Sequence, residues 1–230
     1  MKILVTRPRA DGEEIAARLA EMGHQALLAP LLEPRFFDGP EPALDDVQAI
    51  LATSANGVRA LIRRTPRRDV PVFAVGPQTA EEATKAGFTD VRSADGDAVA
   101  LAEAASGWAK PEGVLLHVCG EDAPGTLADT LAARGFAVRR AVLYGMAAAG
   151  ELPHEARAAL AENRLDGVMF FSPKTARLFL ILAEGLPFAG LTAFCISPAT
   201  AGALASGLFA QVRIADRPNQ AAMLALVNRA

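Results

Sequence analysis

The sequence contains little of what several protein classes require. Its 230 residues include only two cysteines, Cys119 and Cys195, and three histidines without ligand spacing, which indicates neither a disulfide framework nor a metal site. The formal net charge of −3 lacks the basic excess of a nucleic-acid-binding protein. No apolar run is long enough to span a membrane, and the charged N-terminus is not typical of a signal peptide. We therefore expect a cytoplasmic protein without a metal, a membrane anchor or a nucleic-acid partner.

Two common enzyme motifs are also missing, namely G-x-G-x-x-G and G-x-S-x-G. The segment Gly120–Thr126, GEDAPGT, is similar to a phosphate-binding Walker A loop because it follows an apolar run and opens a helical pattern. It lacks the lysine before Thr126 that would neutralise the phosphates. A nucleotide or sugar-phosphate enzyme that uses this loop stays an alternative.

Apolar runs alternate with helical patterns along the whole chain, an order typical of α/β proteins with mostly parallel sheets. We expect strands at Lys2–Thr6, Gln25–Pro30, Val47–Ala52, Pro71–Val75, Asp90–Arg92, Gly113–Val118, Phe136–Met146, Asp166–Phe171, Leu191–Ile196 and Gln211–Ile214. We expect helices at Asp11–Met22, Asn56–Arg64, Thr79–Ala86, Ala98–Ala105, Thr126–Arg134, Glu155–Asn163, Thr175–Glu184, Thr200–Ala205 and Gln220–Asn228.

The proline-rich segment Pro30–Leu44 breaks this alternation and indicates a domain boundary. The β-α-β unit before it is too small to form a domain alone, so its partners are expected in the chain from Ala147 onward. We predict a discontinuous domain of residues 1–32 and 147–230, with residues 37–142 inserted as a second domain. The expected fold is two α/β three-layer domains with mostly parallel sheets, joined by a two-stranded linker near residues 31–37 and 139–146.

A two-part pattern occurs twice in the chain. Ala193–Leu204 corresponds to Val72–Ala83, each with an apolar run, a small residue, a proline and then x-Thr-Ala. Ile50–Ile62 corresponds in the same way to Val168–Leu180. The repetition predicts two lobes of similar design.

The repeated segments are strand-to-helix turns. Helix N-termini carry unpaired N–H groups and a positive dipole end, which suit an anion. Ser54 and Ser172 are typical N-cap residues, and Thr79 and Thr200 fall in the first helical turns. Capping alone is the alternative role for these hydroxyls.

Few titratable residues lie near the predicted turns. Arg7 follows the first strand, Lys174 lies in the second Ser-Pro turn and Arg217 precedes the last helix. Tyr144, the single tyrosine, lies on a predicted linker strand and is either a half-buried aromatic or a weak general acid. This composition favours binding and shaping a polyanion over difficult proton chemistry.

Seven segments together resemble one family over essentially the whole chain, the uroporphyrinogen-III synthases. They are LVTRP at 4–8, ATSANGVRAL at 52–61, AVGPQTAEEATKAGF at 74–88, LADTLAARGFAVRRAVLY at 127–144, FFSPKTARLF at 170–179, ISPATAGAL at 196–204 and PNQAAML at 218–224. Each motif alone is weak, and their order and spacing carry the resemblance.

The resemblance implies an enzyme that takes the linear tetrapyrrole hydroxymethylbilane, a substrate with eight carboxylates. It would expel the terminal hydroxyl as water, invert ring D through a spiro intermediate and close the macrocycle to uroporphyrinogen III. Without such an enzyme the bilane closes to the type I isomer. The resemblance further implies that no cofactor and no metal is used, and that the site lies in the cleft between two domains. We expect a monomer.

The resemblance also implies roles for individual residues. Tyr144 matches a tyrosine proposed to assist hydroxyl loss, and Thr200 is the second catalytic candidate. The candidate substrate-binding residues are Arg7, Ser54, Asn56, Thr79, Ser172, Lys174, Ser197 and Thr200. Two departures are that Ser197 replaces the family's usual glycine and that the loop Gly120–Gly125 has no basic residue.

A two-lobed small-anion binding protein without catalysis stays the main alternative, because a hinge and helix N-termini would serve it equally well.

Overall fold

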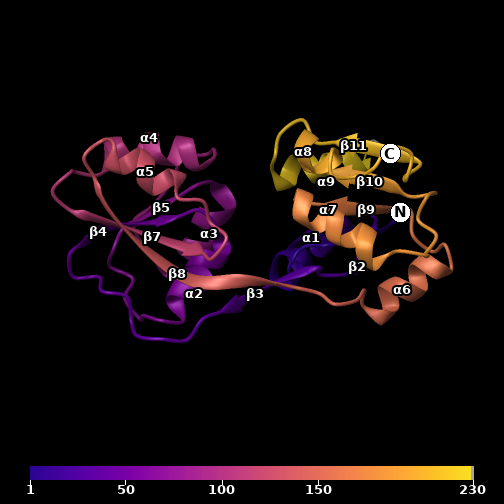
Figure 1. Ribbon diagram of the computed structural model, residues 1–230, viewed down its shortest axis with the longest axis horizontal. Helices are drawn as coiled ribbons and strands as arrows, with labels where there is room; N and C mark the ends of the chain where they lie inside the picture. The colour runs from indigo at the N-terminus through magenta and orange to yellow at the C-terminus, as the bar shows by residue number, and fades with distance from the viewer. Residues whose placement is uncertain (229–230) are drawn as a thin grey trace. The chain divides into compact units, whose positions relative to one another are not determined.

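The structure is a computed structural model that describes residues 1–228 and divides into two compact units. Unit 1 comprises Met1–Glu33 and the chain from Ala147 onward, and unit 2 comprises Pro34–Met146. Figure 1 shows both units as helices around a sheet. The chain passes from unit 1 to unit 2 along one strand and returns along another, as described below.

Unit 1 is built on a five-stranded sheet in the order β11-β10-β9-β1-β2, with every neighbouring pair parallel. The strands are β1 (Lys2–Val5), β2 (Gln25–Leu28), β9 (Gly167–Phe170), β10 (Thr192–Cys195) and β11 (Gln211–Ile214). Because the inner strands are buried on both faces, they read as continuous apolar runs rather than as alternating patterns. This explains why the sequence pattern located them.

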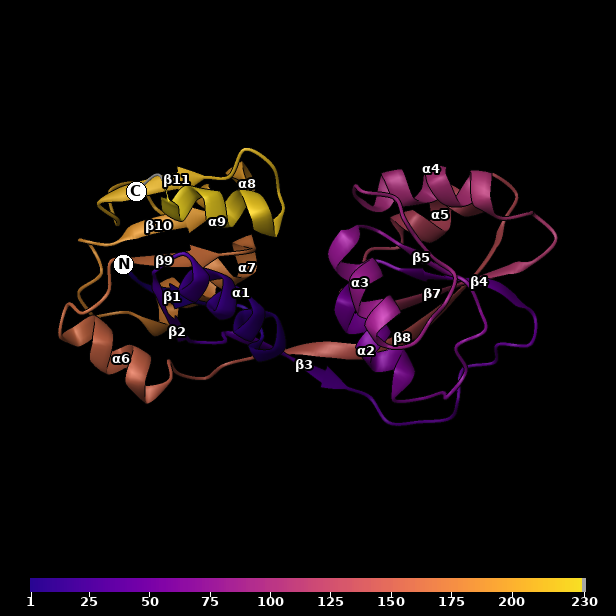
Figure 2. The same cartoon turned by 180° about the vertical axis from the view of Figure 1, so that it is seen from behind.

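Helices cover both faces of this sheet. Phe170 packs with α6, α7 and α8 in one core cluster, and Met169, the preceding residue, packs with α1 and α9 in the other. Figure 1 shows α7 in front of the sheet, and Figure 2 shows α1 and α9 on the opposite face. The helices are α1 (Arg9–Glu21), α6 (His154–Ala161), α7 (Pro173–Leu182), α8 (Pro198–Ala201) and α9 (Gln220–Asn228).

Unit 2 has a six-stranded sheet in the order β3-β8-β7-β4-β5-β6. The pairs from β8 to β6 are parallel. The strands are β3 (Leu32–Phe36), β4 (Val47–Ala52), β5 (Val72–Ala74), β6 (Val91–Ser93), β7 (Val114–Gly120) and β8 (Ala137–Ala148). β3 contains Pro34 and lies at the edge of the sheet, where a missing N–H costs no ladder hydrogen bond.

The unit 2 sheet is also covered on both faces. Ile50 and Ala52 pack with α2 and α3, whereas Ala49 and Leu51 pack with α4 and α5. The helices are α2 (Ala55–Ile62), α3 (Pro77–Lys85), α4 (Ala98–Trp108) and α5 (Thr126–Ala132). The expected fold class, α/β with mostly parallel sheets, is confirmed.

Two neighbouring strands, β3 and β8, carry the chain between the units. The N–H of Phe37 donates to the carbonyl of Leu143 at 2.9 Å, just beyond the end of β3. The N–H of Ala149 donates to the carbonyl of Leu31 at 2.9 Å, just beyond the end of β8. These bonds continue the pairing of the two segments at both ends.

Several predicted helix boundaries are wrong. α3, α7 and α8 start at Pro77, Pro173 and Pro198, two residues before the threonines that the sequence suggested. Proline suits the first helical position because its φ is preset and its missing N–H would have no helical partner. α8 ends already at Ala201, four residues short of the expected end. The predicted strands are confirmed to within two residues at either end.

No helix among residues 1–228 is both long and apolar enough to cross a bilayer.

Gly57 in α2 is expected to tolerate no side chain. A Cβ on Gly57 would lie 2.8 Å from the carbonyl oxygen of Val118 in β7, so Gly57→Ala forces the helix away from the sheet. We expect a loss of about 1–3 kcal/mol in the free energy of unfolding, measured by urea denaturation. The control is Gly107→Ala in α4, where a Cβ meets nothing within 4 Å and the better helix propensity of alanine raises stability by up to about 1 kcal/mol. Equal effects of the two substitutions would contradict this account.

Candidate functional site

Four strand-to-helix turns follow one design, two in each unit. Their N-cap residues are extended in backbone conformation, namely Ser54, Gly76, Ser172 and Ser197. In three of the turns proline follows the N-cap, and threonine follows two residues later. Because β4 pairs in parallel with β5, and β9 with β10, the two turns of each unit emerge side by side at the carboxyl edge of its sheet.

The two turns of unit 1 are held by the same hydrogen bonds. Ser172 Oγ accepts from the N–H of Thr175 at 3.1 Å and lies 3.0 Å from its Oγ1. Ser197 Oγ accepts from the N–H of Thr200 at 3.3 Å and also lies 3.0 Å from its Oγ1. Both threonines are buried, and Thr200 has no exposed surface. Ser197 therefore caps α8, and the hydroxyl of Thr200 is engaged within its own turn.

Thr175 is a residue that the sequence reading missed. It occupies in α7 the position that Thr200 occupies in α8. The signal was present in the sequence, since S-P-x-T occurs both at 172–175 and at 197–200. The longer two-part repeat between the lobes obscured this shorter repeat within one lobe.

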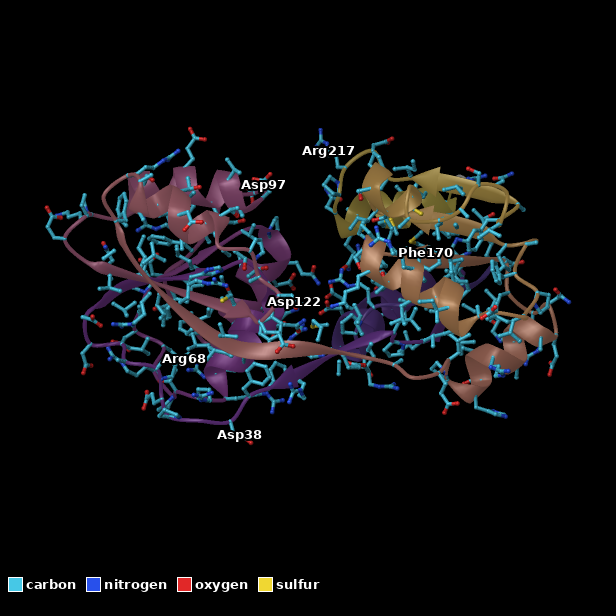
Figure 3. All side chains as sticks on the ribbon, in the orientation of Figure 1. Asp38, Arg68, Asp97, Asp122, Phe170 and Arg217 are labelled. Atoms are coloured by element: carbon cyan, nitrogen blue, oxygen red, sulfur yellow. The ribbon has the colours of Figure 1, made fainter. Side chains whose placement is uncertain are left out.

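The basic candidates of unit 1 lie in different parts of the unit. Arg7 donates to the buried Asp11 at 2.5 Å, and its guanidinium lies 4.9 Å from the ring centroid of Phe171. Phe171 directly precedes the N-cap Ser172, so Arg7 is fixed beside the β9–α7 turn. Lys174 is exposed in the first turn of α7. Arg217 extends from the loop before α9, as Figure 3 shows.

In unit 2 the turn before α2 brings Ser54 and Asn56 together. Ser54 Oγ accepts from the N–H of Asn56 at 3.1 Å. Asn56 is 8% exposed, and its Oδ1 accepts from Arg59 Nη1 at 3.1 Å. Thr79, in the neighbouring turn before α3, is 5% exposed.

Tyr144 lies on β8 beside the end of β7. The pairing of β7 with β8 shifts between Cys119 and Gly120, so that Leu143 on β8 has no partner residue and forms a β-bulge. As a result, Leu143 and Tyr144 pack in the same core cluster and not on opposite faces of the sheet. The ring of Tyr144 lies against Gly120, where an added Cβ would approach its Cε2 and Cζ to 3.0 Å.

The phenol of Tyr144 is kept protonated at neutral pH. Burial raises its pKa above the usual value, and a hydrogen bond with Ser54 offsets part of this increase. A protonated phenol beside a strand-to-helix turn is chemically suited to donate a proton or a hydrogen bond. Among the predicted residues, the fold thus brings Tyr144, Ser54 and Asn56 together.

A buried histidine, His117 on β7, is a second feature that the sequence reading missed. Its side chain is on the face of the sheet covered by α4 and α5, and the residue is 2% exposed. Its Nε2 lies 3.2 Å from Thr53 Oγ1, directly before Ser54, whereas its Nδ1 has no partner within the described part of the chain. Burial, followed by the charge of Arg140, lowers the pKa of His117 to about 4. His117 therefore holds the β4–α2 turn as a neutral imidazole.

The loop Gly120–Thr126 has no feature of a phosphate site beyond its place in the fold. Its own charged residues are Glu121 and Asp122, both exposed, and Figure 3 shows Asp122 on this loop. Arg140 on β8 donates to the carbonyl of Ala123 at 2.8 Å. Residues 1–228 contain no group of three or more histidine, cysteine or acidic side chains that could hold a metal ion. Cys119 and Cys195 are buried and not bridged.

Comparison with known proteins decides the family. The family described as uroporphyrinogen-III synthase HemD matches residues 13–225. The chain belongs to the uroporphyrinogen-III synthase family. The match includes all the predicted site residues except Arg7, and it does not favour the alternative of a non-catalytic anion-binding protein.

Solved structures with the same fold include two of this family. The chain is 20% identical to the uroporphyrinogen-III synthetase of Helicobacter pylori 26695, with a TM-score of 0.68 and coverage of 99% of this chain and 98% of that one. It is also 20% identical to a mutant uroporphyrinogen III synthase of the extreme thermophile Thermus thermophilus, with a TM-score of 0.51 and coverage of 100% and 98%. No curated protein matches the chain.

His117 is expected to make the protein sensitive to acid. From pH 6.5 down to about 4 the unfolded chain binds a proton at this histidine and the folded protein does not, so stability falls with pH. The total loss is about 3 kcal/mol, at about 1.4 kcal/mol per pH unit. We expect His117→Gln to remove this contribution from the pH dependence of the free energy of unfolding, measured by urea denaturation from pH 4 to 7.5. The control is His154→Gln at an exposed position, which is expected to leave the dependence of unfolding free energy on pH unchanged. If this dependence persists in His117→Gln, His117 is not its source.

Proposed function

We propose that this protein converts hydroxymethylbilane to uroporphyrinogen III, closing the macrocycle with loss of water and inversion of ring D. The observation that carries the proposal is the family match over residues 13–225. The reaction belongs to the lyases, and the substrate is a small linear tetrapyrrole with eight carboxylates. We further propose that the enzyme works as a cytoplasmic monomer without a cofactor.

The substrate's charge has to be accommodated by a protein whose own formal charge is −3. We propose that the turns before α2, α3 and α7 donate hydrogen bonds to its carboxylates, with Arg7 and Lys174 as the basic contributors. Neutral N–H donors at helix N-termini stabilise anions without adding mobile charge, and their effect adds up when they are already oriented.

Tyr144 is proposed as the residue that assists loss of the terminal hydroxyl. Its protonated phenol donates to the departing oxygen, which leaves as water together with the transferred proton. The resulting azafulvene is reactive, so the main task of the enzyme is to hold the chain such that ring D is attacked at its substituted carbon. Thr200, also predicted as catalytic, is buried and bonded to Ser197, which favours a positioning role in its turn.

The proposed reaction is tested by incubating the protein with freshly prepared hydroxymethylbilane and separating the oxidised products by chromatography. Uroporphyrinogen III is expected as the main product. A nucleotide or sugar-phosphate enzyme, or an anion-binding protein without catalysis, would yield only the type I isomer that forms spontaneously.

Tyr144→Phe is expected to slow isomer III formation about 100-fold without abolishing it, because only the proton donor is lost while the turns still orient the substrate. The measurement is the initial rate of isomer III formation together with the ratio of isomers. An unchanged rate would rule out the proton-donor role of Tyr144.

A further inference from the structure

The side-chain amide of Asn56 has a defined orientation. Asn56 is the second residue of α2, and its Oδ1 accepts from Arg59 Nη1 at 3.1 Å, one helical turn further on. A guanidinium has donors only, so the atom that faces it is the amide oxygen and the amide nitrogen points elsewhere. The positions of the oxygen and nitrogen in the Asn56 carboxamide are therefore fixed by the guanidinium of Arg59.

Arg59 is itself held by an acid on the neighbouring helix. Its Nη2 lies 2.7 Å from Glu82 Oε2 in α3, and the two side chains are only 19% and 22% exposed. A half-buried charge-assisted pair of this length restricts the guanidinium more than an exposed pair does. Glu82 also neutralises Arg59, so the arginine orients the amide without presenting an uncompensated charge of its own.

The Nδ2 group of Asn56 has no acceptor among residues 1–228. Nδ2 is also not one of the buried side-chain atoms that lack a hydrogen-bond partner. This nitrogen is therefore accessible to solvent and is part of the 8% of Asn56 that is exposed. A nitrogen with two N–H donors that stays open to solvent in a residue buried to more than nine-tenths is well placed to meet a ligand. It lies at the N-terminus of a helix, where the dipole favours a negative group.

The turn around Asn56 also contacts the proposed proton donor. Ser54 caps the N–H of Asn56 at 3.1 Å, and its side chain also lowers the pKa of the Tyr144 phenol, which burial raises. An acceptor bound to Asn56 Nδ2 is therefore held by the turn that Ser54 connects to the phenol. For a substrate rich in carboxylates, such a contact would hold an acidic side chain near the group that loses its hydroxyl.

We propose that Asn56 Nδ2 donates to a carboxylate of the bound tetrapyrrole, and that Arg59 and Glu82 are positioning residues that keep this donor turned toward the ligand. The identity of the ligand rests on the function proposed above. The donor, its orientation and the carboxylate class follow from the contacts of α2 and α3.

Asn56→Asp separates recognition from packing. Aspartate has the same shape, still accepts from Arg59 and, as an acid in the first turn of a helix, suits the dipole, so the stability of the fold is retained or raised. The donor is replaced by an anion that repels a carboxylate. We expect at least a tenfold higher KM for hydroxymethylbilane and at least tenfold weaker binding of uroporphyrin III, the stable oxidised octacarboxylate, measured by fluorescence titration.

Asn163→Asp is the matched control for the added charge. Asn163 follows α6 in unit 1 and has a φ of 51°, a conformation that aspartate also tolerates. It lies before β9, at the amino edge of the sheet and away from the turns. The KM of the Asn163→Asp variant for hydroxymethylbilane and its affinity for uroporphyrin III are expected to stay within about twofold of the values of the original protein.

Arg59→Lys tests the positioning role. Lysine can keep the pair with Glu82 but lacks the fork that also reaches Asn56 Oδ1. The KM is expected to rise in the original background, with kcat less affected, and to show no further change when combined with Asn56→Asp. A purely structural role of Arg59 would give the same loss in both backgrounds.

The outcomes separate this inference from the proposed reaction. Unchanged KM and uroporphyrin affinity in folded Asn56→Asp would overturn the carboxylate contact even when the original protein makes isomer III. If the original protein makes no isomer III but Asn56→Asp still weakens uroporphyrin binding, the reaction is refuted and the carboxylate contact stands. Absence of both turnover and uroporphyrin binding in the original protein would refute both. If Asn56→Asp does not fold, Asn56→Ala, which also removes the donor, must show the same loss of affinity.

Discussion

The parallel pairing of neighbouring strands is the constraint on which the candidate site depends. In a parallel sheet every strand ends at the same edge, and each following helix starts there. The turns after β4 and β5, and those after β9 and β10, are therefore adjacent although they come from distant parts of the sequence. Three of these turns, all but the one after β5, have a serine cap that satisfies one backbone donor and fixes the path of the turn. The remaining backbone donors of the turns stay at the sheet edge.

Buried polar side chains connect these turns to the core. His117 holds Thr53, Ser54 contacts the phenol of Tyr144, and Arg59 with Glu82 ties α2 to α3. The groups in these contacts are either neutral or paired with an opposite charge, and this limits the electrostatic cost of burying them. In the proposed function, a protein of net charge −3 binds a polyanion, and this arrangement would favour binding because the donors are preorganised and their charges are already compensated.

Local signals predicted the elements well and their ends less well. The strands of both units are short apolar runs, and burial on both faces makes such runs easy to find. Helices with proline at the first position were predicted to start at the threonine two residues later, although Ser172 was already identified as a typical N-cap residue. Thr175 was not among the predicted site residues, although it occupies in the S-P-x-T sequence at 172–175 the position that Thr200 occupies at 197–200.

The sequence by itself determined the α/β class, the resemblance to the family and which residues stand in the turns, since these depend on periodicity, spacing and residue type. Only the tertiary structure decided which side chains meet. A one-residue bulge places Tyr144 on the α2 face, and β7 carries His117 under Thr53. An ion pair between two helices sets the orientation of the Asn56 amide. Register and helix packing are long-range properties, so no local pattern contains them.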